Sequence, residues 1–356
     1  MADALALVAP GRPLRLGLER VLLAKRGALI VIGDDAAVLS ICTGGFLIDA
    51  EFSPQRLTEL AKMDGAIIMS SDTDRIARAN VHLMPSSSVP TSETGTRHRT
   101  AERVARSIDV PVLSVSAAMG VITVYRNAEK HVLQAAGRLH DTVSQSLQAI
   151  QRFRHRFDLA VTSLSALEIE DTVTLADVAA VLQPAEILLR VGHELEPMFI
   201  ELGDDGRLLR LQLGELIQGV EPVRRLVVRD YLRVSSGGDG PDLSAQEEKV
   251  LGALARLSTE ELLDGRKVGT ALGLSPAQSD LEESLEPRGY RLLYRLPHFS
   301  EGLVDRIVRH FAGLQKIMRA SVGDLEQVGG VGQARARSVK DGLSRLAEAS
   351  ILDRYT

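Results

Sequence analysis

The feature that most constrains the fold is a change in the spacing of apolar residues near Lys130. Before this point, apolar residues form short, uninterrupted runs of strand length between turn-forming residues, which is typical of an α/β domain. After it, they recur every three or four residues, as in Val132, Ala136 and Leu139, which is the spacing of amphipathic helices. The pattern predicts an α/β domain followed by a long helical region.

Three apolar runs in the first part are predicted to be central strands of a mixed sheet flanked by helices. They cover residues 28–33, 65–69 and 121–125. Ser53 and Pro54 precede a helical pattern, and a serine N-cap followed by proline is a common helix start. We therefore expect a helix from Pro54 onwards.

The chain has 356 residues, which is too long for one ordinary core and indicates two or three domains. We predict an α/β domain at 1–130, an all-α spine at 131–285 and a small all-α domain at 286–356. The composition of residues 235–241 is typical of a flexible loop, after which helices are expected from Leu243 to about Ser284. The last domain is expected to consist of short helices broken by glycine and proline.

Hydropathy and cysteine content narrow the class of protein. No apolar stretch approaches the ~18 residues that span a bilayer, and no basic segment with a following apolar run begins the chain. We therefore expect a cytoplasmic protein with no membrane partner. The single cysteine, Cys42, excludes a disulfide or a cysteine-based metal site within one chain, and it is predicted to be a buried thiol.

Charge is distributed unevenly along the chain. Residues 286–356 carry 12 Lys/Arg and 8 Asp/Glu, a local charge of +4, whereas the whole chain carries −5. The first 285 residues therefore carry −9. The C-terminal part is the part that would bind a polyanion.

Asp64 and Gly65 stand immediately before a predicted strand. A carboxylate at the entrance to a strand can bind a divalent metal, and glycine allows a nucleotide to approach the backbone closely. The same two residues also form ordinary turns before strands, so this pattern alone leaves both interpretations open.

A second polar cluster, residues 93–103, leads into a helical pattern. Its arginines offer forked donors to phosphate, and the start of a helix adds backbone N–H groups and the positive end of the helix dipole. The cluster favours a triphosphate-binding site, with a solvated basic turn capped by Thr96 as the alternative. The donors in its centre are Thr96, Arg97, His98, Arg99 and Thr100.

Together the two clusters resemble the diadenylate cyclase domain, whose hallmarks are an Asp-Gly-Ala and an Arg-His-Arg motif. Here these are residues 64–66 and 97–99, and residues 75–83 between them are also similar to the family. The resemblance extends from about Leu14 to Tyr125. It implies that two ATP molecules are condensed into cyclic di-AMP and two pyrophosphates, by attack of each ribose 3′-hydroxyl on the other α-phosphate across two domains that meet face to face.

The resemblance also assigns roles to residues. Asp64 would bind Mg²⁺ or Mn²⁺ and act in catalysis together with Arg97, His98 and Arg99. The ATP-binding residues would be Gly65, Leu83, Thr96, Arg97, His98, Arg99 and Thr100. The sequence departs from the family at residues 117–119, where Ala-Ala-Met replaces a Gln-Arg type of sequence, so we expect weaker nucleotide contacts there.

Residues 325–339 match a helix-hairpin-helix signature, in which a Gly-apolar-Gly hairpin precedes a helix. Such hairpins press against the DNA backbone, so binding would be independent of sequence and sensitive to salt. A purely structural helical hairpin is the alternative, and residues 296–304 resemble a degenerate, mainly structural partner hairpin. The predicted DNA-binding residues are Gly330, Gly332, Arg335, Arg337 and Lys340.

This order of domains resembles the DNA-integrity scanning diadenylate cyclases, the DisA family. The resemblance implies a homo-octamer whose cyclase activity is modulated by branched or damaged DNA. One alternative is a DNA-binding scaffold with a nucleotide-binding but catalytically weak cyclase domain. Another is a repair nuclease or helicase accessory, although no Walker-type phosphate loop is present to support an ATP motor.

Overall fold

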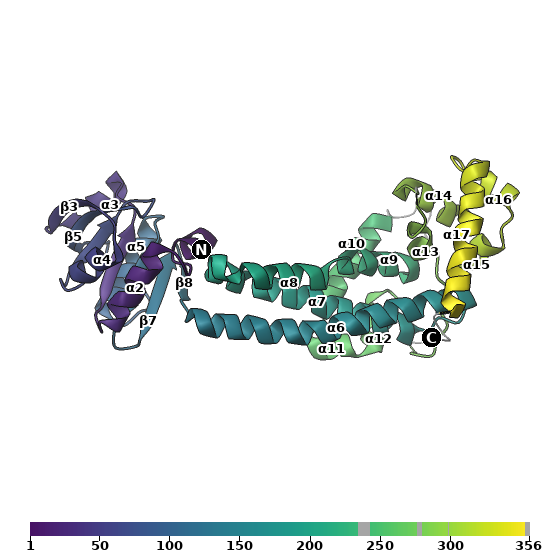
Figure 1. The fold of residues 1–356 in the computed structure, drawn as a ribbon, viewed down its shortest axis with the longest axis horizontal. Coiled ribbons are helices and arrows are strands. Elements are labelled where there is room, and N and C mark those ends of the chain that lie inside the picture. Colours follow the sequence, from purple (N-terminus) through teal and green to yellow (C-terminus); the bar gives the residue numbers. More distant parts are fainter. Residues whose placement is uncertain (234–242, 276–279, 298, 353–356) are drawn as a thin grey trace. The chain divides into compact units, whose positions relative to one another are not determined.

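A computed structural model of the chain describes residues 1–233, 243–275, 280–297 and 299–352. The chain separates into two compact units, the first formed by Met1–Gln145 and Glu194–Gln212, the second by Ser146–His193 and Leu213–Thr356 (Figure 1). The loop predicted at 235–241, and His298 in the predicted partner hairpin, lie outside the described residues.

The first unit contains a mixed sheet in the order β2-β5-β4-β1-β6-β7-β8, with β3 also paired to β5. β1 and β4 run parallel, and the six other strand pairs formed by the described residues are antiparallel. The strands are β1 (Ala28–Ile32), β2 (Cys42–Thr43), β3 (Phe46–Glu51), β4 (Ala66–Met69), β5 (Arg75–Leu83), β6 (Val112–Ser116), β7 (Val121–Arg126) and β8 (Glu129–Val132).

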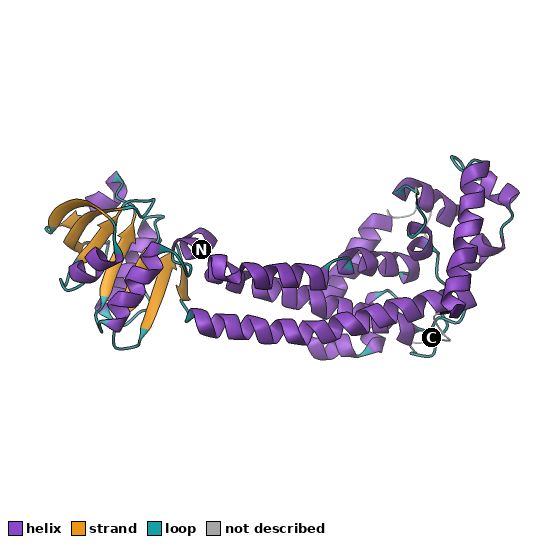
Figure 2. Ribbon diagram, viewed as in Figure 1, coloured by secondary structure: helices purple, strands orange, loops and turns teal. Residues whose placement is uncertain are grey.

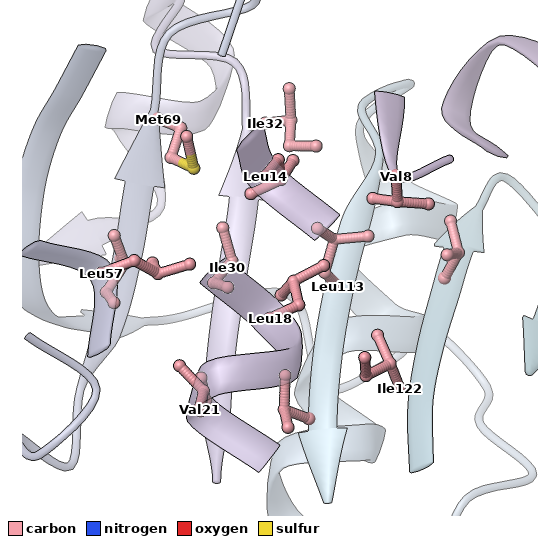
Figure 3. Close-up of a cluster of buried hydrophobic side chains, with 14 of the residues drawn as sticks. Val8, Leu14, Leu18, Val21, Ile30, Ile32, Leu57, Met69, Leu113 and Ile122 are labelled. Atoms are coloured by element: carbon pink, nitrogen blue, oxygen red, sulfur yellow. The ribbon is translucent and has the colours of Figure 1, made fainter. Parts of the chain in front are cut away.

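Helices cover both faces of this sheet, because successive residues of its central strands point to opposite sides. In β1, Ile30 and Ile32 pack into one buried cluster, shown in Figure 3, whereas Leu29 and Val31 pack into another. The first cluster lies under α1 (Ala2–Leu7), α2 (Pro13–Leu23) and α4 (Pro54–Leu60), and the second under α3 (Ala36–Ser40) and α5 (Thr96–Ser107). The predicted mixed sheet flanked by helices is confirmed.

The start of α4 is as predicted, because Pro54 is its first residue and the Ser53 hydroxyl accepts a hydrogen bond from Arg56 N at 3.2 Å. The start of the helical region is not. Residues 129–132 form β8, in which Val132 pairs with Thr123, and the next helix begins only at Ala136. A strand is recognised in a sequence by the alternation of apolar and polar residues. The edge strand β8 has only four residues and is followed closely by a helix, so its alternation is too short to be distinguished from the helical spacing.

Cys42 is half-buried and not fully buried as predicted, because it begins the short edge strand β2. Its Sγ lies 3.2 Å from the carbonyl oxygen of Val38. Partial burial raises the pKa of the thiol, against a smaller opposing effect of Arg78. The thiol is therefore mainly protonated at neutral pH.

The rest of the described chain is almost entirely helical (Figure 2). No helix among the described residues is both long and apolar enough to cross a membrane. Following the sheet are α6 (Ala136–Glu170), α7 (Leu175–Leu202), the short 3₁₀ helix η1 (Gly203–Gly206), α8 (Arg207–Ile217), α9 (Val220–Tyr231), α10 (Leu243–Arg256), α11 (Thr259–Leu263), α12 (Gly265–Ala271), α13 (Tyr290–Tyr294), α14 (Glu301–Phe311), α15 (Leu314–Arg319), α16 (Val322–Glu326) and α17 (Gln333–Leu352).

The second unit is held together by an apolar cluster and a buried ionic network. Helices α13 to α17 share one cluster that extends from Tyr290 to Leu343. The Arg291 guanidinium donates to both carboxylate oxygens of Glu168 on α6, at 2.5 and 3.0 Å, and the Tyr231 hydroxyl donates to the same carboxylate at 2.8 Å. The predicted short C-terminal helices are confirmed except for α17, which has 20 residues.

Candidate active site

The Asp-Gly-Ala motif forms the turn that enters β4. Asp64 presents its carboxylate to solvent with 98% of the side chain exposed. The Gly65 amide donates to Oδ1 of Asn80 on β5 at 3.1 Å, and a Cβ on Gly65 would lie only 2.3 Å from the carbonyl carbon of Asn80. Glycine is therefore required here by the packing of this turn on β5, which is a different reason from the nucleotide contact predicted from the sequence.

The Arg-His-Arg motif forms the first turn of α5. The N-cap is Gly95, whose lack of a side chain leaves the first backbone N–H groups without a side-chain acceptor at the cap. Thr96 is the first helical residue, so the alternative of a turn capped by Thr96 is wrong. The Thr100 hydroxyl donates to the carbonyl oxygen of Thr96 at 3.0 Å, one turn back along the helix.

Arg97 joins the two motifs. Its Nη2 donates to Oδ1 of Asp64 at 2.8 Å, across 33 residues of sequence. The other side of the guanidinium lies against Gly27, where a Cβ would come within 2.4 Å of Arg97 Nη1. The guanidinium is thus held between a carboxylate and a glycine at the start of β1, with 41% of the side chain exposed.

His98 points away from solvent. It is buried beneath α5, where its Nδ1 lies 2.8 Å from the Tyr125 hydroxyl. That hydroxyl donates to Oε1 of Glu93 at 3.1 Å, and Lys130 donates to the same oxygen at 2.9 Å. Burial and the negative charge of Glu93 raise the pKa of Tyr125, so its hydroxyl remains a donor.

The remaining predicted residues differ in how accessible they are. Arg99 is exposed, and no acceptor for its guanidinium lies among the residues that the structure describes. Leu83 is half-buried at the end of β5, where it pairs with Cys42 of β2. The structure thus brings Asp64, Arg97 and Gly65 together and exposes Arg99, while it buries His98.

A divalent metal fits this site only as a shared ion. Among the described residues, no group of three or more His, Cys, Asp or Glu side chains could hold a metal by itself. Mg²⁺ is commonly bound by one or two carboxylates together with substrate phosphates, and Asp64 offers one accessible carboxylate beside the start of a helix. Asp64 is therefore suited to bind an ion that arrives with a triphosphate.

Comparisons with known proteins identify the family of the chain. Residues 15–130 match the family model for the "DisA bacterial checkpoint controller nucleotide-binding" domain, and residues 133–281 match that for the "DisA bacterial checkpoint controller linker region". A "DNA integrity scanning protein DisA" of Streptomyces coelicolor is 49% identical over 100% of this chain and 94% of its own length. That of Frankia casuarinae is 50% identical over 99% and 96%, respectively.

The chain belongs to the DisA family. It is a diadenylate cyclase, and the residues around Asp64 and Arg97 lie in its nucleotide-binding domain. Among solved structures, DacA from Staphylococcus aureus aligns with a TM-score of 0.29, at 24% identity over 37% of this chain and 92% of that chain, a similarity too weak to carry any argument.

Several residues that shape the nucleotide-binding domain of this DisA family member were missed in the sequence. Asn80 adopts a left-handed backbone (φ 55°) and its side chain accepts a hydrogen bond from the Gly65 amide; asparagine is uncommon inside strands, which was the signal in the sequence. Glu102 is buried and accepts hydrogen bonds from Thr91 Oγ1 at 2.5 Å and Ser92 N at 3.0 Å. Burial alone would raise the pKa of Glu102, but these hydrogen bonds and Arg106 lower it, so the carboxylate stays ionised.

The sequence departure at 117–119 falls in an exposed turn between β6 and β7, where Met119 is 62% exposed. The Met119 amide donates to the Ser116 hydroxyl at 3.3 Å. The turn therefore closes locally without the polar side chains that the resemblance led us to expect.

The C-terminal hairpin of this DisA family member lies between α16 and α17. Gly330 has φ 88°, a conformation that favours glycine, and Val331 is buried beneath the turn. Arg335 donates to the carbonyl oxygen of Gly330 at 2.8 Å, and Arg306 of α14 donates to that of Gly329 at 2.7 Å.

The predicted DNA-binding residues around this hairpin differ in how exposed they are and in whether the fold already uses their donors. Gly332, Arg335 and Arg337 are exposed. Lys340 is half-buried and donates to the carbonyl oxygen of Met318 at 2.6 Å, so its ammonium is already used within the fold. Arg335 and Arg337 are the side chains best placed to meet a polyanion.

Proposed function

We propose that two copies of the chain meet face to face, each with one ATP, and join the two nucleotides into cyclic di-AMP. Each ribose 3′-oxygen forms a bond to the α-phosphorus of the other ATP, the bond from that phosphorus to the departing pyrophosphate breaks, and each 3′-hydroxyl gives up its proton. The observation that carries this proposal is the Asp64–Arg97 pair at the exposed start of α5. The pair places a carboxylate that can bind a metal beside a guanidinium that can donate to phosphate.

In this proposal Asp64 binds the metal ion that activates the attacking 3′-hydroxyl. Its exposed carboxylate would hold Mg²⁺ or Mn²⁺ together with the phosphates of the substrate. When bound, the ion lowers the pKa of the 3′-hydroxyl and neutralises charge on the phosphates. Asp64 contributes by fixing this position, which is the main task of an enzyme that transfers phosphoryl groups without a protein nucleophile.

The first turn of α5 is assigned to the triphosphate. Its backbone N–H groups have no side-chain cap, and Arg97 and Arg99 offer charged, forked donors beside them. Thr96 and Thr100 add hydroxyls, and Leu83 and Gly65 contribute to the nucleotide pocket in this proposal. Arg97 then exchanges its hydrogen bond to Asp64 for one to a phosphate, which releases the carboxylate.

DNA is the partner proposed for the C-terminal hairpin. The relatives carry the name "DNA integrity scanning protein", and the hairpin presents exposed glycines and the exposed Arg335 and Arg337. Such a surface binds the phosphate backbone and not the bases, so affinity is expected to fall steeply with salt. We propose further that branched or damaged DNA modulates the cyclase and that the chain forms an octamer in the cytoplasm, where ATP and DNA are both present.

The cyclase proposal is tested on the full chain with ATP and either Mg²⁺ or Mn²⁺, and cyclic di-AMP is measured by mass spectrometry. Asp64→Asn is expected to lower the rate by about 100-fold or more with little change in thermal stability, because the side chain is almost fully exposed. Asp3→Asn is the matched control, since Asp3 is 92% exposed and also faces an arginine. Product from neither metal, or full activity of Asp64→Asn, contradicts the proposal.

Regulation and assembly are tested separately. The rate of cyclic di-AMP synthesis is measured with linear duplex and with four-way branched DNA at equal nucleotide concentration, and only the branched DNA is expected to lower it. Light scattering gives the mass of the assembly. Equal rates with both DNAs contradict the regulatory part, and a monomer that remains active contradicts the face-to-face reaction.

A further inference from the structure

Behind α5, three side chains connect the Arg-His-Arg motif to the last strand of the sheet. Oε1 of Glu93 accepts hydrogen bonds from Tyr125 at 3.1 Å and from Lys130 at 2.9 Å. The Tyr125 hydroxyl also meets Nδ1 of His98 at 2.8 Å. Glu93 itself stands two residues before Gly95, the N-cap of α5. The start of the helix is therefore anchored from its preceding segment and from His98.

The sheet fixes this arrangement. Tyr125 of β7 and Lys130 of β8 are directly opposite each other in the antiparallel register, so both side chains lie on the same face and meet one carboxylate. Tyr125 is 1% exposed, and the side chain of Glu93 is 18% exposed. Because buried polar groups need partners, loss of the Glu93 carboxylate would leave the Tyr125 hydroxyl without its acceptor.

The opposite face of β8 is held by helix α7. Residues that are adjacent in a strand point to opposite sides, and His131 follows Lys130. His131 Nε2 lies 2.6 Å from Oε2 of Glu201, near the end of α7, and Oε1 of Glu201 accepts from Gln134 N at 2.6 Å. The Glu201 side chain is only 3% exposed. One short strand thus contacts the motif's anchor on one face and α7 on the other.

We propose that Glu93 and Lys130 are positioning residues of the cyclase reaction, which act through Tyr125 and His98 to hold the first turn of α5 in register with the triphosphate. This inference rests on the proposed function in one respect, the assignment of that turn to phosphate. It also gives His98 a role beneath the helix in place of a direct phosphate contact. Through His131, the position of the turn becomes sensitive to Glu201 and α7.

The test uses full-length Glu93→Ala, Glu93→Gln and Lys130→Met, with Lys62→Met as control because Lys62 is equally exposed and also paired with a glutamate. Glu93→Ala and Lys130→Met are expected to lower kcat about tenfold or more while the equilibrium affinity for ATP stays within about threefold, since misplacement of donors costs more in the transition state than in binding. Glu93→Gln keeps an acceptor oxygen and is expected to restore most of the rate.

A second measurement does not depend on turnover. Amide hydrogen exchange of residues 100–103, which follow the first turn of α5, is expected to be faster in Glu93→Ala and Lys130→Met than in Lys62→Met. If the wild type makes no cyclic di-AMP, the proposed function fails, while the exchange data still decide whether Glu93 holds the helix. If the wild type is active and Glu93→Ala matches the control in both kcat and exchange, the positioning role is wrong.

The link to α7 is tested by a double-mutant cycle. Glu201→Gln keeps the shape of the side chain and is expected to speed exchange of residues 100–103 in the wild-type background. In the Lys130→Met background it is expected to add little, because the connection through β8 is already broken. Equal effects in both backgrounds, or no effect in either, contradict the connection.

Discussion

Gly27 lies outside both motifs, yet its replacement by alanine is expected to disable the site. A Cβ at this position would lie 2.4 Å from Nη1 of Arg97, whereas ordinary contacts begin near 3.4 Å. The guanidinium must therefore move by about 1 Å. The two nearest atoms belong to the end of a flexible side chain, and the nearest backbone atom, the carbonyl oxygen of Val115, lies at 3.3 Å and needs only a slight shift, so the surrounding fold can remain largely unchanged.

The stability and activity effects of Gly27→Ala should differ greatly in size. The displaced bond to Asp64 is an exposed ion pair, which contributes at most about 1 kcal/mol to stability, or a few degrees in the unfolding temperature. A 1 Å displacement of a group that binds the transition state costs about 100-fold in rate, which corresponds to about 2.7 kcal/mol. The assay is the initial rate of cyclic di-AMP formation at saturating ATP, together with thermal unfolding of the same samples.

Gly137→Ala is the matched control, since nothing lies within 4 Å of a Cβ at that position in α6. It is expected to retain the wild-type rate. If Gly27→Ala is as active as this control, the proposed role of the Arg97 guanidinium is wrong. If instead Gly27→Ala unfolds at a much lower temperature, the side chain is not free to move and the reasoning about Gly27 fails.

Gly65→Ala would place a Cβ 2.3 Å from the backbone of β5. It should lower the cyclase activity and also lower the free energy of unfolding by about 1–3 kcal/mol, measured by denaturant titration. Unchanged stability would refute the packing argument. Arg335→Gln combined with Arg337→Gln should weaken DNA binding and reduce the slope of log affinity against log salt by about 1–2, measured by anisotropy, while cyclase activity without DNA is unchanged; an unchanged slope would place DNA elsewhere. The hydrogen bond to Glu201 raises the pKa of His131 above 6.5, against the opposing effect of burial. The protonated His131 therefore stabilises the folded chain fully below pH 6.5, and this contribution is lost as the pH rises through the raised pKa. His131→Gln should flatten this part of the curve of unfolding temperature against pH.

The C-terminal module cannot be removed cleanly to test its function. Arg291 of α13 is buried against Glu168, and the carboxylate of Asp230 accepts three backbone hydrogen bonds, from the amides of Gly289, Tyr290 and Arg291. Burial, reinforced by the nearby Glu168, raises the pKa of Asp230 to about 7. Truncation after residue 285 would remove the arginine that pairs with Glu168 and all three amide donors to Asp230, which is strongly destabilising, so substitutions on the hairpin surface are the better experiment.

Local sequence patterns were sufficient for much of the first unit. The uninterrupted apolar run of β1 reflects a strand that is covered on both faces, and Ser53-Pro54 marked the start of α4. The burial of His98 was also available in principle, since Ala101 and Ala105 lie on the same side of the helix, but the neighbouring arginines suggested a solvent-facing cluster. β8 was missed because four residues are too few to establish a period.

The sequence by itself determined the types of the main elements, the two motifs and, through resemblance, the reaction, because these depend on periodicity and on residue types close together along the chain. Only the tertiary structure decided that Arg97 contacts Asp64, that Asn80 and Gly27 shape the two motifs, and that β8 connects His98 to α7. These contacts join residues that are far apart in sequence. Their geometry is set by strand register and by the steric fit of one element against another, which no local pattern encodes.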